Sequence, residues 1–201
     1  MTPHIQPRAG LADEHSHWLD TYPEHLSRTW TLASGEIVLV RPVRHDDDER
    51  EEAFVRGLSR ESAYQRLLSG GIKITPEWIE HMTHVDYHRH MAFAITTANR
   101  SVEQIVGVGR YVVAPGSARA EIALVIADAW QGQGLGRRLL ETLLEHAEEA
   151  GLHEVAGTVL ATNRAMLGLA RLLGFTVSAE PGDATVVRIR RSLAKSNPQP
   201  H

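Results

Sequence analysis

The chain has 201 residues, no cysteine, a net charge of −4 and a hydrophobic fraction of 42%. This length favours one domain with short tails, and the lack of cysteine excludes disulfides, thiolate zinc ligands and a thiolate nucleophile. No basic stripe, signal peptide or apolar span of about 20 residues is visible. We therefore expect a cytoplasmic protein that binds neither nucleic acid nor a membrane.

The first half of the chain predicts a polar tail, one strand and three helices. Residues 1–21 are polar and lack periodicity, which is typical of a flexible tail. Residues 36–41 are rich in β-branched side chains and predict a strand. The acidic run over 46–52 suits the first turn of a helix, and we interpret it as a solvated helix start. Ser59 and Thr75 are candidate caps of two further helices, each about ten residues long.

The second half predicts a sheet interleaved with helices. Strands are expected over 91–95, 104–113, 120–127, 154–160, 175–180 and 184–190. A leucine-rich helix is expected over 134–150 and another over 163–173. Because strands and helices alternate, the fold class is mixed α/β, of the α+β kind. One domain is expected over about 22–192, followed by a flexible tail over 193–201.

The most informative segment joins the strand over 120–127 to the long helix and contains three alternating glycines: Gly132, Gly134 and Gly136. Glycines let a ligand approach backbone amides closely, and free amides at a helix start bind anions. Arg137 and Arg138 lie in the first turn, where the macrodipole disfavours positive charge, so their presence indicates a bound anion. Alternatively, they pair with Glu141 one turn on. The glycine spacing fits neither a Walker A loop nor a dinucleotide fingerprint.

Three features together resemble the GNAT superfamily of acyl-CoA-dependent N-acetyltransferases. They are the strand over 121–127, the Q/R-x-x-G-x-G/A motif at Gln131, Gly134 and Gly136, and the segment 163–175. Residues 40–44, 54–62 and 85–93 resemble the catalytic domain of Pat-type bacterial protein lysine acetyltransferases, and the resemblance covers about 22–191. It implies the GNAT fold: a mixed, mostly antiparallel sheet of about six or seven strands, splayed between the fourth and fifth and flanked by helices. In that family the domain is often fused to a second one, but because only 21 residues precede Tyr22 we expect a stand-alone catalytic domain.

The resemblance further implies that acetyl-CoA binds as co-substrate. The amides after the splayed strand would hold the pyrophosphate of coenzyme A, and the strand itself would pair with the pantetheine arm. The implied binding residues are Leu124, Val125, Ile126, Gln131, Gly132, Gln133, Gly134, Leu135, Gly136, Arg137, Arg138 and Asn163. A role as the N-cap of its helix explains Asn163 equally well.

Acyl transfer to an amine needs a general base, because a lysine ammonium with a pKa of about 10.4 keeps its proton at neutral pH. Glu121 is the candidate, since it interrupts an apolar strand and falls where the resemblance places a catalytic glutamate. Alternatively, it lies at the solvated end of the strand and pairs with Arg119. If the hairpin turns around Gly116, Tyr111 lies opposite Glu121 and orients it. We expect a strand amide near Val125 to stabilise the oxyanion.

Two further features bear on the mechanism. Ala170 replaces the tyrosine that many GNAT enzymes use as general acid, which leaves the proton donor unidentified. Without cysteine, an acyl-cysteine intermediate is excluded, and direct attack by the amine in a ternary complex is expected. His81 and His84 are spaced like a metal pair, but only Asp86 stands nearby as a further ligand, and we expect no metal.

Three functions remain open at this stage. The first is acetylation of a protein lysine, with acetyl-CoA synthetase as a target on the strength of the resemblance alone. The second is the same chemistry on a small amine. The third is a non-catalytic acyl-CoA-binding module, which the intact Glu121 and glycine motif disfavour. The acceptor, the acyl-chain preference and the oligomeric state do not follow from the sequence.

Overall fold

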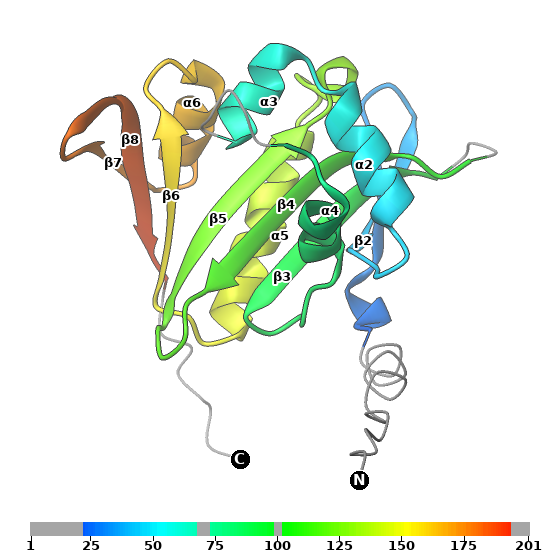
Figure 1. The fold of residues 1–201 in the computed structure, drawn as a ribbon, viewed down its shortest axis with the longest axis horizontal. Coiled ribbons are helices and arrows are strands. Elements are labelled where there is room, and N and C mark those ends of the chain that lie inside the picture. The colour runs from blue at the N-terminus through cyan, green and yellow to red at the C-terminus, as the bar shows by residue number, and fades with distance from the viewer. Residues whose placement is uncertain (1–21, 68–72, 99–101, 194–201) are drawn as a thin grey trace, which may run out of the picture.

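The computed structural model describes residues 22–67, 73–98 and 102–193 (Figure 1). The tails predicted over 1–21 and 193–201 lie outside these residues, except for Leu193. In chain order the elements are η1 (Glu24–Leu26), β1 (Arg28–Thr31), β2 (Ile37–Pro42), α2 (Asp48–Gly57), α3 (Arg60–Leu67), α4 (Pro76–Thr83), β3 (His90–Thr97), β4 (Ile105–Val113), β5 (Arg119–Ile126), η2 (Asp128–Trp130), α5 (Leu135–Glu149), β6 (Glu154–Leu160), α6 (Arg164–Leu172), β7 (Thr176–Glu180) and β8 (Asp183–Ser192). Within the described residues, no helix combines the length and apolar character needed to cross a lipid bilayer.

One eight-stranded sheet in the order β1-β2-β3-β4-β5-β6-β8-β7 forms the centre of the protein. All neighbouring strands are antiparallel except β5 and β6, which are parallel. This confirms the mixed, mostly antiparallel sheet of the predicted fold. The strand that sequence patterns missed is β1, in which only Trp30 is buried, so it carries too few apolar residues to be detected.

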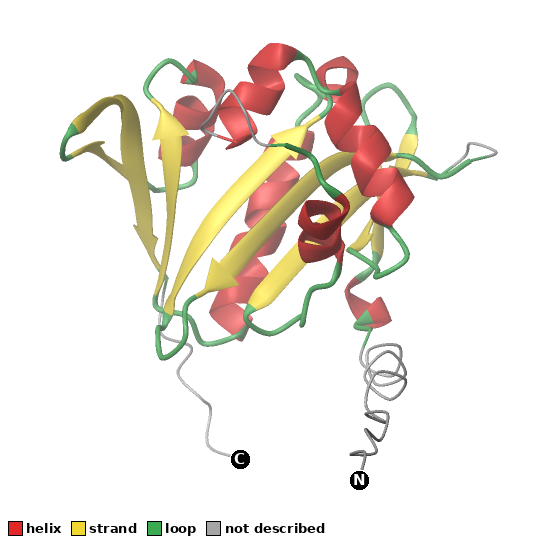
Figure 2. Ribbon diagram, in the orientation of Figure 1, coloured by secondary structure: helices red, strands yellow, loops and turns green. Residues whose placement is uncertain are grey.

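The sheet opens between β5 and β6. Residues 119–121 of β5 pair with residues 154–156 of β6, and beyond that point the two strands diverge (Figure 2). The predicted strands did not include β1, so the predicted fourth and fifth strands are β5 and β6, and the opening lies where the splay was predicted. The divergence leaves the second half of β5 without a partner on its β6 side, which is where a ligand can enter the sheet.

Helices cover both faces of the sheet (Figure 1). Helix α5 lies behind β4 and β5, whereas α2 and α4 lie on the opposite face and α3 lies near the carboxyl end of β5. The predicted apolar face of α5 is confirmed, since its members are all buried: Leu135, Leu139, Leu140, Leu143, Leu144 and Ala147. Gly109 of β4 permits this packing, because a Cβ there would lie 2.9 Å from side-chain atoms of α5.

The predicted helix caps are present. Thr75 Oγ1 accepts a hydrogen bond from the amide of Trp78 at the start of α4 (3.2 Å). Ser59 Oγ likewise accepts from the amide of Ser62 at the start of α3 (3.1 Å). Each hydroxyl satisfies an amide that has no partner within its helix.

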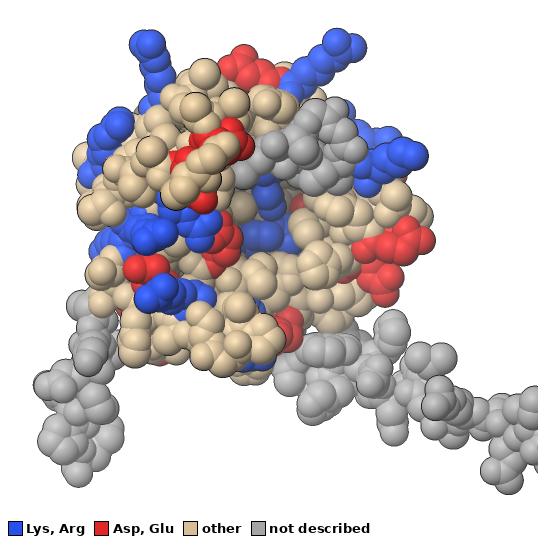
Figure 3. All heavy atoms as spheres, turned by 60° about the vertical axis from the view of Figure 1, so that its left-hand side comes forward, with Lys and Arg blue, Asp and Glu red and all other residues tan. Residues whose placement is uncertain are grey.

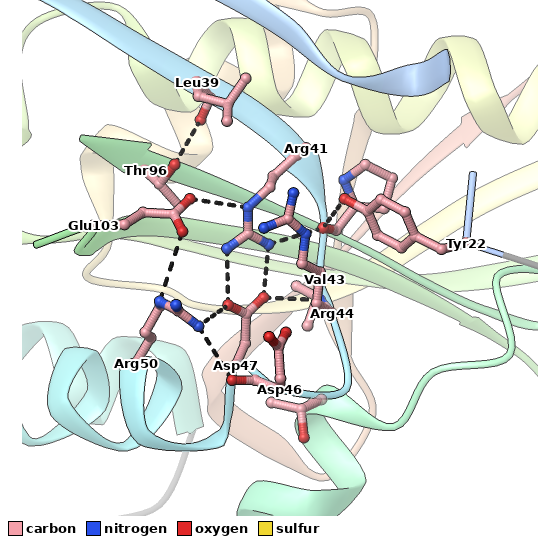
Figure 4. Close-up of polar contacts among 12 residues, drawn as sticks. Tyr22, Leu39, Arg41, Val43, Arg44, Asp46, Asp47, Arg50, Thr96 and Glu103 are labelled. Atoms are coloured by element: carbon pink, nitrogen blue, oxygen red, sulfur yellow. Dashed lines mark hydrogen bonds and ion pairs between the residues drawn. The ribbon is translucent and has the colours of Figure 1, made fainter. Parts of the chain in front are cut away.

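The acidic run over 46–52, which forms the start of α2, is only partly the solvated helix start that was predicted. Asp47 is fully buried and forms a bidentate ion pair with Arg41 of β2, at 2.7 and 2.8 Å (Figure 4). Glu103 accepts a further hydrogen bond from Arg41 Nε (3.0 Å), and the amide of Arg44 donates to Asp47. Desolvation favours the protonated form of Asp47, but the hydrogen bond and charge of Arg41 outweigh it and lower the pKa of Asp47.

The register of the β4–β5 hairpin differs by one residue from the prediction. Val112, not Tyr111, lies opposite Glu121, because the turn centres just after Gly116 rather than on it. Side chains alternate along a strand, so Tyr111 projects from the other face of the sheet. Its hydroxyl lies 2.8 Å from Nδ1 of His146 in α5. The prediction that Tyr111 orients Glu121 is therefore wrong.

Candidate active site

A cavity of about 540 Å³ lies where β5 and β6 diverge, bounded by α3, α4, the start of α5 and α6. Figure 3 shows a hollow on this side of the molecule, with blue atoms of basic residues visible in it. Nine of the predicted site residues line the cavity: Glu121, Leu124, Val125, Ile126, Gln131, Gly132, Leu135, Gly136 and Asn163. Gln133, Gly134, Arg137 and Arg138 do not line it.

The loop between β5 and α5 suits an anion. Gly132 and Gly134 adopt positive φ angles of 75° and 82°, which place the chain in the left-handed region and turn it sharply into the helix. Gly134 is the N-cap of α5 and carries no side chain that could bond the first amides. Those amides are therefore available to a ligand at the positive end of the helix dipole, as the pyrophosphate of coenzyme A requires.

This loop is anchored to α3 by side chains. Gln131 Nε2 donates to the carbonyl oxygen of Ile126 (2.9 Å) and to Ser62 Oγ (3.2 Å). Asp128 accepts hydrogen bonds from the amide and hydroxyl of Ser59 and from the hydroxyl of Ser62, at 2.7 to 2.9 Å. The glutamine of the motif and Asp128 thus fix the loop against the start of α3.

The two loop arginines have different partners. Arg137 Nε donates to Glu141 Oε1 at 2.8 Å, which is the alternative pairing that the sequence left open. The guanidinium of Arg138 lies over the ring of Trp30, 5.2 Å from its centroid, and donates to the carbonyl of Thr31. Both arginines remain near the loop, but neither points into the cavity.

The backbone of β5 presents alternate residues to the gap. The amide of Ala127 donates to Val106 of β4, whereas the carbonyl of Ile126 is turned away from β4 and accepts from Gln131. Alternation along the strand therefore turns the backbone groups of Leu124 and Ile126 toward the gap and those of Val125 toward β4. An oxyanion donor on this strand is the amide of a neighbour of Val125 rather than its own.

Asn163 lies at the start of α6, on the cavity wall. Its Oδ1 accepts a hydrogen bond from the amide of Met166 at 3.0 Å, so it caps the helix. The capping interpretation is confirmed, and Asn163 also lines the cavity.

Glu121 lies at the last residue pair before β5 and β6 diverge. Its carboxylate forms a bidentate ion pair with Arg188 of β8, at 2.5 and 3.1 Å, and Arg188 also donates to Thr158 Oγ1 (2.9 Å). Pairing of Glu121 with Arg119 is wrong, since Arg119 approaches Glu154 at 3.8 Å. Among the described lining residues Glu121 is the only carboxylate, and about half of its side chain is exposed.

A buried charged cluster lies on the same face of the sheet as Glu121 and was not predicted. Arg110 of β4, opposite Ala123, donates to Glu51 Oε1 (3.2 Å) and to the carbonyl of Met82 (2.9 Å). Desolvation raises the pKa of Glu51 and lowers that of Arg110. A lone arginine in the apolar strand over 104–113 is the sequence signal that indicates such a cluster.

The histidines are dispersed among different neighbours. The ring of His81 lies 5.6 Å from that of His90, whereas the ring of His84 lies 4.7 Å from that of His45. Burial lowers the pKa of His90 to about 4. Among the described residues, no group of three or more His, Asp or Glu side chains is arranged to hold a metal ion.

The fold and this loop agree with a sequence comparison. The model of the acetyltransferase (GNAT) family matches residues 56–175. The chain belongs to the GNAT acetyltransferase family. The acetyltransferase is 32% identical over 185 residues to Acetyltransferase PA5475 of Pseudomonas aeruginosa, which covers 92% of this chain and 94% of that one.

The likeness to Pat proteins is visible in sequence and structure. Acetyltransferase Pat of Mycolicibacterium smegmatis is 30% identical over 144 residues, which are 71% of this chain but only 42% of that protein. The crystal structure of the GNAT domain of S. lividans PAT superposes with a TM-score of 0.76 at 29% identity, covering 86% of this chain and 99% of that domain. A 60-residue segment, 30% of this chain and 35% of the relative, is 38% identical to an L-methionine sulfoximine/L-methionine sulfone acetyltransferase of P. aeruginosa. The protein is an acyl-CoA-dependent N-acetyltransferase that resembles the Pat catalytic domain.

Proposed function

We propose that this acetyltransferase transfers the acetyl group of acetyl-CoA to the amine of a protein lysine, with Glu121 as general base. The observation that carries the proposal is the position of Glu121, at the mouth of the gap between β5 and β6. A lysine acceptor is what the resemblance to Pat-type protein lysine acetyltransferases implies, and the likeness to Pat proteins extends over most of the chain.

The proposed acetyl-CoA site runs from the start of α5 into the gap. The amides of residues 132–137 would hold the pyrophosphate, because no side chain caps them. The backbone groups of Leu124 and Ile126 would pair with the pantetheine arm, and one of their amides would stabilise charge on the thioester carbonyl oxygen. Asn163 would contact the arm from α6, whereas Arg137 and Arg138 would raise the positive potential at the loop.

Glu121 is suited to accept the proton of an acceptor ammonium. Its carboxylate already binds a cation, the guanidinium of Arg188, and about a quarter of the Arg188 side chain is exposed. A lysine ammonium that enters the gap would take the place of this guanidinium and transfer its proton to Glu121. The neutral amine then attacks the thioester carbon directly, the attacking nitrogen releases its second proton to solvent, and the C–S bond breaks to expel the thiolate of coenzyme A. Ala170 has no acidic group and is buried in α6, so it cannot act as general acid. The thiolate therefore takes its proton from solvent in the open gap.

A small amine is the second candidate acceptor. The segment shared with the L-methionine sulfoximine/L-methionine sulfone acetyltransferase favours it. Acetylation of a cell lysate read by mass spectrometry, beside a panel of free amines, separates the two acceptors. Modified lysines in the lysate with slow turnover of every free amine support the protein acceptor.

The Glu121→Gln variant tests the base. We expect kcat/KM to fall at least about 100-fold, because general base catalysis contributes this much, with acetyl-CoA affinity by calorimetry within about twofold of the wild type. Glu154→Gln is the matched control, because it removes a carboxylate that approaches an arginine on the neighbouring strand. An unchanged rate for Glu121→Gln would remove Glu121 from the base role, and absent acetyl-CoA binding in the wild type would overturn the proposal.

A further inference from the structure

One cation on the cavity wall has no hydrogen-bond or ion-pair partner among the described residues. Arg66 of α3 is the only lysine or arginine among the described residues that line the main cavity. Its guanidinium forms no hydrogen bond or ion pair with any residue that the structure describes. Burial, with the nearby charge of Arg110, lowers the pKa of Arg66 to about 10, so it remains protonated at neutral pH.

The surroundings of Arg66 carry an excess of positive charge. Arg110 is buried nearby, and the charge of Glu51, which pairs with Arg110 and lines the small cavity with Arg66, acts on both arginines. Oε2 of Glu51 and Nε of Arg110 lack hydrogen-bond partners in the described part of the chain. Two guanidinium groups therefore lie near one carboxylate, and only Arg110 is paired with it, so the charge of Arg66 is left to be neutralised by a second anion.

The position of Arg66 relates this charge to the reaction. Arg66, Trp78 and Val125 line both the main cavity and a small adjoining cavity. Arg110 lies opposite Ala123, which stands between Glu121 and Val125 on the same face of β5. The excess charge thus borders the stretch of β5 where the thioester and the base meet, whereas the pyrophosphate loop is joined to α3 one turn earlier, at Ser62.

We propose that Arg66 is a carboxylate-binding subsite at the reacting end of the cavity. The proposal rests on the acetyl-CoA site described above. A substrate carboxylate can come from two sources: the ω-carboxylate of a dicarboxylic acyl-CoA such as succinyl-CoA, or the carboxylate of the acceptor, as in a free amino acid. In either case the substrate carboxylate is the second anion, and it would form a bidentate ion pair with the guanidinium of Arg66.

Binding measurements test the subsite without requiring turnover. In the acyl arm, calorimetry compares succinyl-CoA with butyryl-CoA. In the acceptor arm, it compares L-methionine with L-methioninamide in the presence of coenzyme A. In one of the arms we expect the wild type to bind the carboxylate form at least about tenfold more tightly than its neutral counterpart, as a charge-assisted pair provides.

The variants identify the group responsible. Arg66→Gln is expected to abolish this preference, so that the carboxylate and neutral forms bind equally, while the affinity for coenzyme A stays within about twofold of the wild type. Arg66→Lys keeps the charge and is expected to keep part of the preference, which decides the question if the glutamine variant fails to fold. Arg60→Gln is the matched control, because it removes an exposed arginine from the same helix outside the cavity.

Three results would overturn the proposal. They are no carboxylate preference of the wild type in either arm, a preference that survives in Arg66→Gln, and an equal loss of affinity for coenzyme A itself. The last result would assign Arg66 to the cofactor phosphates. Failure of the proposed function is seen separately, as an unchanged rate of Glu121→Gln, so the two failures are distinguishable.

Discussion

Replacing Asp47 by asparagine is expected to lower the free energy of unfolding by about 3 kcal/mol. Asp47 and Arg41 are both fully buried, and the substitution removes the charge that compensates the guanidinium. Breaking a buried ion pair by removing one partner costs about 3–5 kcal/mol, because the other charge is left in a low dielectric. We place the loss at the lower end, since Glu103 still accepts from Arg41 Nε and asparagine keeps one acceptor oxygen.

The loss is measured by urea denaturation followed by circular dichroism. For a domain of this size, about 3 kcal/mol corresponds to a fall of roughly 10 °C in the melting temperature. The control is Glu52→Gln, which removes an exposed pair with Arg56 within α2 (2.7 Å) and is expected to cost about 0.5 kcal/mol or less. If the free energy of unfolding of Asp47→Asn lies within about 1 kcal/mol of the wild-type value, the buried ion pair of Asp47 with Arg41 does not stabilise the protein as proposed.

Two further predictions concern the loop glycine and a buried histidine. Gly134→Ala should cost about 1 kcal/mol of stability, because an alanine is strained at φ 82°, and should weaken acetyl-CoA binding about tenfold in calorimetry. Gly35→Ala, at φ 85° in a distant turn with equally open space, should cost the same stability and leave affinity unchanged, and equal affinities of both variants would contradict this. The pKa of His90 is lowered to about 4, so from pH 6.5 to 5 the unfolded chain gains its proton and the folded protein does not. Stability should therefore fall by up to about 2 kcal/mol over this range, and His90→Gln should flatten the dependence in urea midpoints; an unchanged slope would show that His90 is not buried as a neutral ring.

Local features were predictable because their causes are local. The caps at Ser59 and Thr75 and the leucine face of α5 depend on residues within one or two turns. The glycine loop between β5 and α5 was predictable for the same reason, since its conformation depends on a few consecutive residues. These features, with the resemblance, were sufficient for the fold and the region of the site.

Long-range pairings were not predictable, because they depend on register and on residues far apart in the chain. A shift of one residue in the β4–β5 turn moved Tyr111 to the opposite face from Glu121. Glu121 of β5 forms an ion pair with Arg188 of β8, on the other side of β6. Glu51 of helix α2 accepts a hydrogen bond from Arg110 of strand β4. The acidic run over 46–52 was interpreted as a solvated helix start, because its buried partners Arg41 and Arg110 are distant in sequence or lie in other elements.

The hydrogen bonds of Asp128 with Ser59 and Ser62 have a thermodynamic consequence. They couple the conformation of the glycine loop to that of the start of α3. A ligand that orders the loop therefore also orders the helix that carries Arg66. Linkage is reciprocal, and a group that binds at α3 must then increase the affinity of the loop by the same factor. The two substrates of the enzyme would therefore bind with positive cooperativity, and the departure of one product would hasten that of the other.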